Sequence, residues 1–258
     1  MVSDILLSRT GSIATVTLSN PGKLNALDIA MWQKLATCFD ALSADLSLRC
    51  VIVCGENGQF AAGADIEEFG TVRSTLEQGI RYHTVAIGAA LAAINNCVHP
   101  VIAAIEGVCI GGGLEIACAC DLRIASPAAR FGIPINRLGF ALAPGEMPAL
   151  LQLVGRAAAL EILLEGRVFD AAEAVQKGLL TRVAEDVPAA AQQSALRVAQ
   201  GAPMAARLNK QLINRLSPVS QPLTAAEHDA AFAPLGSDDY REGVAAFLAK
   251  RTPVFTGK

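Results

Sequence analysis

Two short turns rich in glycine and alanine carry the residues that could do chemistry in this chain. The first turn is F-A-A-G-A-D-I at 60–66, and the second is G-V-C-I-G-G-G-L-E at 107–115. Small residues let a ligand approach the backbone closely, and a helix that begins after such a turn leaves its first N–H groups free to donate. Two facing turns could aim two N–H groups at one oxygen. That arrangement suits an enolate formed from a thioester, because the negative charge develops on the carbonyl oxygen.

Spacing excludes several other uses of glycine-rich turns. A dinucleotide fingerprint, G-x-G-x-x-G, that starts at Gly111 would need a glycine where Ile116 stands. The chain also lacks the G-K-S/T of a phosphate-binding loop and the G-x-S-x-G of a serine hydrolase. One alternative stays open on spacing alone, namely that the two turns merely pack closely.

Composition and charge restrict the partners. A net charge of −3 over 258 residues argues against nucleic acid, so any anionic ligand must be met by local basic groups. We expect no membrane span, because no apolar run reaches roughly 18 residues. No secretory signal precedes the first strand, and the protein is therefore expected to be cytoplasmic. The seven cysteines form no C-x-x-C pair, which predicts buried, reduced thiols and no metal site.

Each turn follows a predicted buried strand. The segments 50–54 and 101–105 are short, continuously apolar runs, which suits strands that are covered on both faces. A third such run lies at 121–125, and 13–18 alternates between apolar and polar residues as a strand with one buried face does. Because these strands alternate with helical segments, the sequence predicts an α/β fold.

Helices are predicted between and after these strands. Asp28 is the expected N-cap of a helix to about Leu42, and a long helix is expected over 74–95. From about residue 143 the pattern becomes helical, with helices predicted over 147–154, 158–164, 171–177, 189–199, 204–216 and 242–250. We place a boundary near residue 190, between a core unit, 1–190, and a helical C-terminal piece, 191–258.

The sequence resembles the crotonase superfamily, to which the enoyl-CoA hydratases and isomerases belong. The resemblance spans almost the whole chain and is carried by N-A-L at 25–27, FAAGADI at 60–66, P-V-I-A-A at 100–104, EGVCIGGGLEIACACDLRIAS at 106–126 and D-Y-R-E-G-V-A-A-F at 239–247. It implies a spiral core of repeated ββα units. It also implies that 191–258 serves trimerisation, in a homotrimer or a dimer of trimers.

The resemblance assigns the two N–H donors to particular residues. They fall on Ala64, just after Ala62-Gly63, and on Gly112, the middle one of three glycines. The expected ligand is an acyl-CoA thioester, with coenzyme A as part of the substrate and no tightly bound cofactor. Losing one such donor typically raises the barrier by about 2.7–4 kcal/mol.

The resemblance also implies where coenzyme A would bind. Lys23 and Ala26 match positions that line the entrance for the CoA part of the substrate. Backbone near the first turn would contact the adenine, at positions that correspond to Ala62, Asp65 and Ile66.

Two residues of the last predicted helix, Phe247 and Lys250, match positions that close over CoA, commonly from a neighbouring subunit. Lys250 could supply a point charge for a phosphate, or it could simply be a solvated helix end. Asp65 has a structural interpretation too, because Asp65 and Glu68 have the spacing of a capping box. We expect capping to be the main role of Asp65.

Carboxylates are needed for proton transfer, and here the sequence departs from the family. Glu115 matches the first of the two hydratase glutamates, and its place near a helix N-terminus favours its ionised form. An acidic residue in a first helical turn can also be purely structural. The second glutamate falls on Ile135, which can neither give nor take a proton. Glu146 is the next carboxylate, either a replacement partner or the N-terminal charge of the following helix.

These residues lead to two hypotheses. The first is an enzyme that stabilises a thioester enolate and moves a proton with Glu115, in hydration or double-bond isomerisation of an enoyl-CoA. The second is a catalytically silent acyl-CoA-binding protein that lost the second glutamate at Ile135. The sequence singles out none of the three histidines as catalytic.

Overall fold

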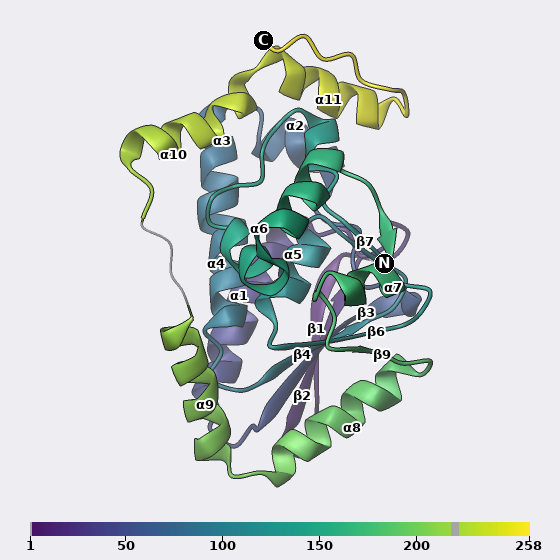
Figure 1. Ribbon diagram of the computed structural model, residues 1–258, viewed down its shortest axis with the longest axis vertical. Coiled ribbons are helices and arrows are strands. Elements are labelled where there is room, and N and C mark those ends of the chain that lie inside the picture. Colours follow the sequence, from purple (N-terminus) through teal and green to yellow (C-terminus); the bar gives the residue numbers. More distant parts are fainter. Residues whose placement is uncertain (1, 218–221) are drawn as a thin grey trace.

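The computed structural model describes residues 2–217 and 222–258, in which two β-sheets are surrounded by helices (Figure 1). The larger sheet has the strand order β1 (Asp4–Thr10), β2 (Ile13–Ser19), β3 (Cys50–Gly55), β4 (Val101–Ile105), β6 (Leu122–Ala125) and β9 (Arg182–Val183). Only β1 and β2 pair antiparallel within it. The smaller sheet contains β5 (Val108–Ile110), β7 (Arg130–Gly132) and β8 (Phe169–Asp170).

The central strands β3 and β4 of the larger sheet are buried on both faces, which confirms the prediction from their apolar runs. Side chains of β3 and β4 alternate between two cores because successive residues of a strand point to opposite faces. One face joins the main core through Val51, Val53, Val101, Ala103 and Ile105. The other face packs on α8 (Val187–Gln200), which lies across the strands from α5 and α6, through Cys50, Ile52, Ile102, Ala104 and Ile124 (Figure 1).

A strand of the larger sheet, a strand of the smaller sheet and a helical segment repeat along the chain. One unit is β4, β5 and α5 (Gly112–Ala119), and the next is β6, β7 and α6 (Met147–Glu165). Ahead of them, β3 leads to Ala61, which makes a single parallel bridge to Cys109 of β5. The expected spiral of ββα units is therefore present. Since β3 and β4 are parallel neighbours, the turns that follow them lie at the same edge.

The predicted first and second helices are present, with a difference in the second. Asp28 caps α1 (Ile29–Ala44) by accepting a hydrogen bond from the Met31 N–H at 2.8 Å. The helix predicted over 74–95 begins at Leu76 and runs as α3 (Leu76–Arg81), a π-helical turn (Tyr82–Ile87) and α4 (Gly88–Asn95). A short 3₁₀ turn (Ile66–Glu68) and α2 (Phe69–Val72) precede it.

The helices of the last third were placed largely as predicted. The segments 147–154 and 158–164 are one helix, α6, with a break in helical dihedrals at Gly155. It is followed by α7 (Ala171–Gln176), α8, α9 (Pro203–Leu216), α10 (Ala225–Phe232) and α11 (Asp238–Leu248). α10 was not predicted, and α11 begins four residues earlier than expected and ends at Leu248. Figure 1 shows α10 and α11 at the opposite end of the molecule from α9.

The length of α6 bears on the expectation that the chain has no membrane span. Joined across Gly155, it is the one helix in the described part of the chain that is long and apolar enough to be a candidate membrane span. Length and composition alone are weak grounds for a span, since helices of soluble proteins pass the same test.

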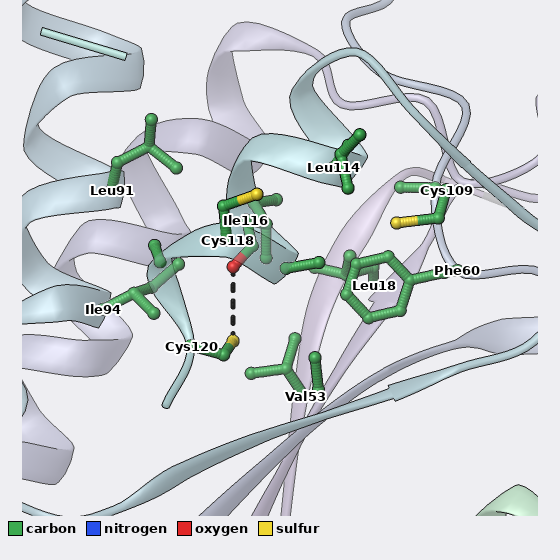
Figure 2. Packing of buried hydrophobic residues seen from close by; sticks show 14 of the residues in the cluster. Leu18, Val53, Phe60, Leu91, Ile94, Cys109, Leu114, Ile116, Cys118 and Cys120 are labelled. Atoms are coloured by element: carbon green, nitrogen blue, oxygen red, sulfur yellow. Dashed lines mark hydrogen bonds between the residues drawn. The ribbon is translucent and has the colours of Figure 1, made fainter. Parts of the chain in front are cut away.

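The cysteines contribute to the core as small apolar side chains. All seven are free thiols, five of them buried and two, Cys38 and Cys54, half-buried. Figure 2 shows Cys109, Cys118 and Cys120 among aliphatic side chains and Phe60, with the Cys120 thiol donating to the carbonyl oxygen of Ile116 at 3.2 Å. Burial raises the pKa of the Cys118 thiol to about 12. These thiols are therefore protonated, as expected of core residues.

Candidate active site

A cavity of about 690 Å³ opens between the two glycine turns. It is formed by the first turn, the second turn, the segment before α1, the long helix, the 3₁₀ turn after β7 and the end of α11. All of the predicted site residues line it, namely Lys23, Ala26, Ala62, Ala64, Asp65, Ile66, Gly112, Glu115, Glu146, Phe247 and Lys250. Residues that are spread over most of the sequence thus meet around one space.

Backbone pairing fixes the direction of the Ala64 N–H in the first turn. The Leu27 N–H donates to the Gly63 carbonyl at 2.7 Å, and the Asp65 N–H donates to the Leu27 carbonyl at 2.8 Å. These bonds flank Ala64 in a parallel bridge, so its own N–H points away from Leu27. Among the described residues, no carbonyl group of a loop or turn accepts a hydrogen bond from the Ala64 N–H.

The second turn presents the first N–H of α5. Gly111, with a φ of 51°, caps the helix, and its N–H donates to the Gly132 carbonyl at 2.9 Å. A positive φ is accessible to glycine at little cost, which explains the residue type there. Gly112 is the first helical residue, and the first N–H groups of a helix have no acceptor within it.

The two turns approach each other closely. A Cβ atom added to Gly63 would lie 3.4 Å from the Gly112 nitrogen, and one added to Gly112 would lie 3.7 Å from the Ala64 nitrogen. Other neighbours require glycine at these positions, because a Cβ atom would lie 3.0 Å from the Ile110 oxygen at Gly63 and 2.7 Å from Trp32 at Gly112, as the simpler interpretation of close packing held. The same packing brings the Ala64 and Gly112 N–H groups to one side of the cavity.

Two buried carboxyl groups, those of Glu115 and Glu146, line the cavity. Glu115 is 7% exposed and Glu146 is 4% exposed. Burial raises the pKa of Glu115 well above its usual value, and the neighbouring Glu146 raises it further, while Arg73 opposes both effects. Burial raises the pKa of Glu146 to about 8, against smaller opposing effects of the Ala143 N–H and Arg73. The pair therefore keeps a proton at neutral pH, so burial outweighs the helix N-terminus that was expected to favour ionised Glu115.

Glu146 is held by His83, which the sequence did not single out. Its Oε1 lies 2.7 Å from His83 Nδ1, and its Oε2 accepts from the Ala143 N–H at 3.3 Å. Burial lowers the pKa of His83 well below its usual value, so the imidazole is neutral, and its Nδ1 can accept a hydrogen bond from the protonated form of Glu146. Spacing did contain a signal, because His83 lies four residues before Ile87 on the buried side of the helix.

Arg73 is the second cavity residue that the sequence did not single out. It directly follows α2, is 2% exposed and lines the cavity. Its guanidinium carbon lies 4.1 Å from the ring centre of Phe69 and 4.3 Å from that of Phe140. In the sequence it stands between Val72 and Ser74 with no neighbour that marks it as buried.

Ile135 occupies the wall where the second family glutamate was expected. It begins the 3₁₀ turn Ile135–Leu138 after β7, is half-buried and lines the cavity. The structure therefore keeps an apolar side chain at this wall. Glu146, at the start of α6, lines the same cavity. This position is required if Glu146 replaces the missing second glutamate.

Charged groups lie at the part of the cavity predicted for CoA. Lys23 Nζ lies 2.6 Å from Asp65 Oδ2 and 2.8 Å from Glu67 Oε2. Asp65 also caps the 3₁₀ turn by accepting from the Glu67 N–H at 3.2 Å. The full capping box is absent. It would need the Asp65 N–H to donate to the Glu68 side chain, but that N–H donates to the Leu27 carbonyl instead.

Phe247 and Lys250 come from the same chain as the rest of this cavity. Phe247 lies in α11 and is 55% exposed. Lys250 follows the helix end in a left-handed conformation with a φ of 52°, so it is not a helical residue as expected. These two residues therefore reach the cavity of their own chain without a neighbouring subunit.

The spiral of ββα units and the cavity between its glycine turns define a protein of the crotonase type. The family model for enoyl-CoA hydratase/isomerase matches residues 8–258. A probable enoyl-CoA hydratase of Mycobacterium bovis is 35% identical over 258 residues, which cover 98% of this chain and 97% of the relative. The chain therefore belongs to the enoyl-CoA hydratase/isomerase family, whose members act on CoA thioesters.

Solved structures agree with this assignment. A crystal structure of an enoyl-CoA hydratase/carnithine racemase from Magnetospirillum magneticum has 48% sequence identity and a TM-score of 0.81, over 98% of this chain and 96% of that one. A methylmalonyl-CoA decarboxylase has a TM-score of 0.87 over 98% of both chains. At 24% identity, the decarboxylase shows a shared fold alone.

Proposed function

We propose that this protein stabilises the enolate of an acyl-CoA thioester with the Ala64 and Gly112 N–H groups, and moves protons with Glu115 and Glu146. The observation that carries the proposal is the meeting of two buried carboxyl groups and two glycine turns in one cavity. Preorganised donors that point to where charge develops are usually the largest contribution to such catalysis.

The two carboxyl groups differ in their surroundings, and this difference suggests their roles. Burial raises the pKa of both groups, and because the pair keeps a proton, one group carries it and the other is left to act as a base. Glu146 Oε1 lies 2.7 Å from Nδ1 of the neutral His83, which can accept a hydrogen bond from protonated Glu146. We therefore assign Glu115 as the base and Glu146 as the acid, with His83 as a positioning residue.

Two carboxyl groups support hydration of a 2-enoyl-CoA. Glu115 takes a proton from water as the oxygen bonds to C3, and the electrons of the double bond move onto the thioester oxygen between the two N–H groups. Collapse of the enolate then takes the proton of Glu146 onto C2. The product is a 3-hydroxyacyl-CoA, and one proton returns from Glu115 to Glu146 through exchange with water.

Isomerisation is the second candidate, and Ile135 favours it. A double-bond shift needs no water, and one carboxylate can remove a proton from one carbon and return it to another. An apolar side chain at that wall disfavours a bound water molecule. The silent acyl-CoA binder is less well supported, because it leaves two buried carboxyl groups without a role.

A panel of thioesters separates these functions. We expect 2-enoyl-CoA to lose the absorbance of its conjugated thioester while its mass rises by one water. An isomerase would instead turn 3-enoyl-CoA into a conjugated product of unchanged mass. Binding without either change would establish the silent binder. Failure to bind any acyl-CoA at millimolar concentration in calorimetry would overturn the assignment altogether.

Substitution of the carboxyl groups is the first specific prediction. Glu115→Gln and Glu146→Gln should each lower kcat by about 10²–10⁴-fold, the usual contribution of a general acid or base. The affinity for a saturated acyl-CoA should stay within about threefold, because that binding needs no proton transfer. Glu77→Gln, on the exposed side of α3, is the matched control and should turn over normally. Full turnover by Glu115→Gln on the true substrate would remove Glu115 from the reaction.

The remaining assignments follow from the family and stay predictions. Lys23, Ala26, Ala62, Asp65 and Ile66 are proposed to hold CoA. The trimeric or hexameric assembly, the role of 191–258 in it and the cytoplasmic location stay predictions as well.

A further inference from the structure

Arg73 is a buried cation whose side chain is enclosed by aromatic rings. Its guanidinium lies between Phe69 and Phe140, and the ring centres of Tyr82 and Tyr240 are each 5.3 Å from its central carbon. Cation–π attraction of this kind stabilises the charge above and below the guanidinium plane. Among the guanidinium nitrogens, Nε and Nη2 are left without an acceptor in the described part of the chain, whereas the Tyr240 side chain interacts with the guanidinium by hydrogen bonding.

Those N–H groups have no carboxylate partner among the residues that the structure describes. Neither Nε nor Nη2 of Arg73 makes a hydrogen bond, although both atoms are fully buried. A guanidinium stays ionised inside proteins, and a buried charge without a counter-ion is strongly unfavourable. The empty hydrogen-bonding positions therefore indicate an anion that comes from outside this chain.

The neighbouring carboxyl groups do not take this place. Glu115 and Glu146 are near enough for Arg73 to stabilise their charged forms, but neither forms an ion pair with it. Glu146 is committed to His83 and to the Ala143 N–H. An anion for Arg73 must reach it through the cavity, which Arg73 lines.

The CoA phosphates are poorly placed to be this anion. Lys23 is 38% exposed in its side chain and Lys250 is exposed, so both are accessible from solvent at the mouth of the cavity. Arg73, at 2% exposed, lies among the buried side chains of Phe140, His83 and the two glutamates. With the thioester carbonyl between the two turns, as proposed, the acyl chain is the part of the substrate that enters the buried part of the cavity.

We propose that Arg73 is a specificity-determining residue that binds a carboxylate at the far end of the acyl chain. The preferred substrate is then the CoA thioester of a dicarboxylic acid. A carboxylate fits the in-plane N–H groups of a guanidinium through two parallel hydrogen bonds. This inference rests on the proposed function, because it assumes that the thioester lies between the two turns.

Calorimetry with unreactive, saturated thioesters tests the inference on the wild-type protein. The probes are succinyl-, glutaryl- and adipyl-CoA, each paired with its monomethyl ester, which has nearly the same size but no charge. At the chain length that fits best, we expect the acid to bind about 10–100-fold more tightly than its ester, as for a hydrogen-bonded charge. Equal or weaker binding of the acid at every length overturns the inference while the proposed function stands. Failure of all six probes to bind overturns both.

Variants then show whether Arg73 is responsible. Arg73→Gln should remove most of the preference for the acid over the ester, whereas Arg81→Gln, an exposed arginine on α3, should keep it. Arg73→Lys keeps the charge without the planar donors and should retain part of the preference. If Arg73→Gln weakens acid and ester equally and shifts the pH profile of turnover, Arg73 only tunes the glutamates, and the inference is wrong. Should Arg73→Gln fail to fold, the wild-type comparison decides.

Discussion

Gly112 stands directly against Trp32 of α1, and this contact sets the position of one N–H donor. A Cβ atom at Gly112 would lie 2.7 Å from Trp32 Cζ2, and one at Gly113 would lie 2.4 Å from the Ala61 carbonyl oxygen. Trp32 is fully buried and cannot easily move aside. The Gly112 N–H, one of the two proposed donors, is therefore held in place by packing, which is what the proposed stabilisation of an enolate by N–H groups requires.

Replacing Gly112 by alanine tests this packing. The added methyl group must push the turn away from Trp32, so we expect the free energy of unfolding to fall by about 1–3 kcal/mol. Turnover should fall as well, because the displaced N–H no longer points to the thioester oxygen. Denaturant unfolding and steady-state kinetics measure the two effects.

Gly70→Ala is the matched control for this substitution. Gly70 lies in α2, and a Cβ atom there would meet nothing within 4 Å. Alanine should be neutral there or stabilise the helix by about 0.5–1 kcal/mol. Unchanged turnover by Gly112→Ala, in a protein that folds normally, would argue against an N–H donor at this position.

The residues that the sequence could identify differ physically from those it could not. Asp28 and the glycines act through the local backbone, so their types and spacing predict their roles. Arg73 and His83 act through contacts with distant segments, Phe140 for one and Glu146 for the other. Such pairings depend on the tertiary fold: helical spacing could place His83 on the buried side, but no sequence neighbour identifies Glu146 or Phe140 as the partner.

Among the elements, the long helix after α2 was likewise predicted in part from local sequence and missed in part. Its periodicity predicted a helix, but the π-helical turn Tyr82–Ile87 changes the direction of the side chains. One extra residue per turn brings both Tyr82 and His83 to the buried side. The strands β5 and β7 were missed for another reason, since three residues are too few to show a period.

The end of α11 provides a prediction about CoA. If Lys250 meets a phosphate, Lys250→Gln should raise the KM for acyl-CoA about two- to fivefold and leave kcat unchanged, as for the loss of an exposed charge pair. The KM for an acyl-pantetheine thioester, which lacks the nucleotide, should not change. Lys258→Gln, outside the cavity, is the control. An unchanged KM for acyl-CoA would leave Lys250 as a solvated residue.

At the scale of the whole molecule, the buried carboxyl groups make stability depend on pH. Burial raises the pKa of Glu146 to about 8, that of Glu68 to about 7 and that of Glu115 upward too. Because the folded protein holds these protons more tightly than the unfolded chain, its stability falls as the pH rises through these values. The buried histidines act in the opposite direction, but only below about pH 6.5, where an unfolded histidine becomes charged.

We therefore expect the free energy of unfolding to fall by about 1–3 kcal/mol between about pH 7 and 8, since each buried carboxyl group contributes up to about 1.4 kcal/mol per pH unit. Urea unfolding at fixed ionic strength measures the change. Glu146→Gln should show a shallower decrease, because it has one such group fewer. A stability that is constant or rises over this interval would mean that these carboxyl groups are already ionised at neutral pH.

The cavity is lined by residues from near both ends of the chain, namely Lys23 and Ala26 from the N-terminal part and Phe247 and Lys250 from the C-terminal part. This has a consequence for protein synthesis. A ribosome adds residues in order, so a growing chain can already contain both glycine turns and both buried glutamates while the mouth of its cavity is still unmade. The cavity is complete only after the last helix has been translated, and a chain released early would leave the lining contributed by that helix unmade.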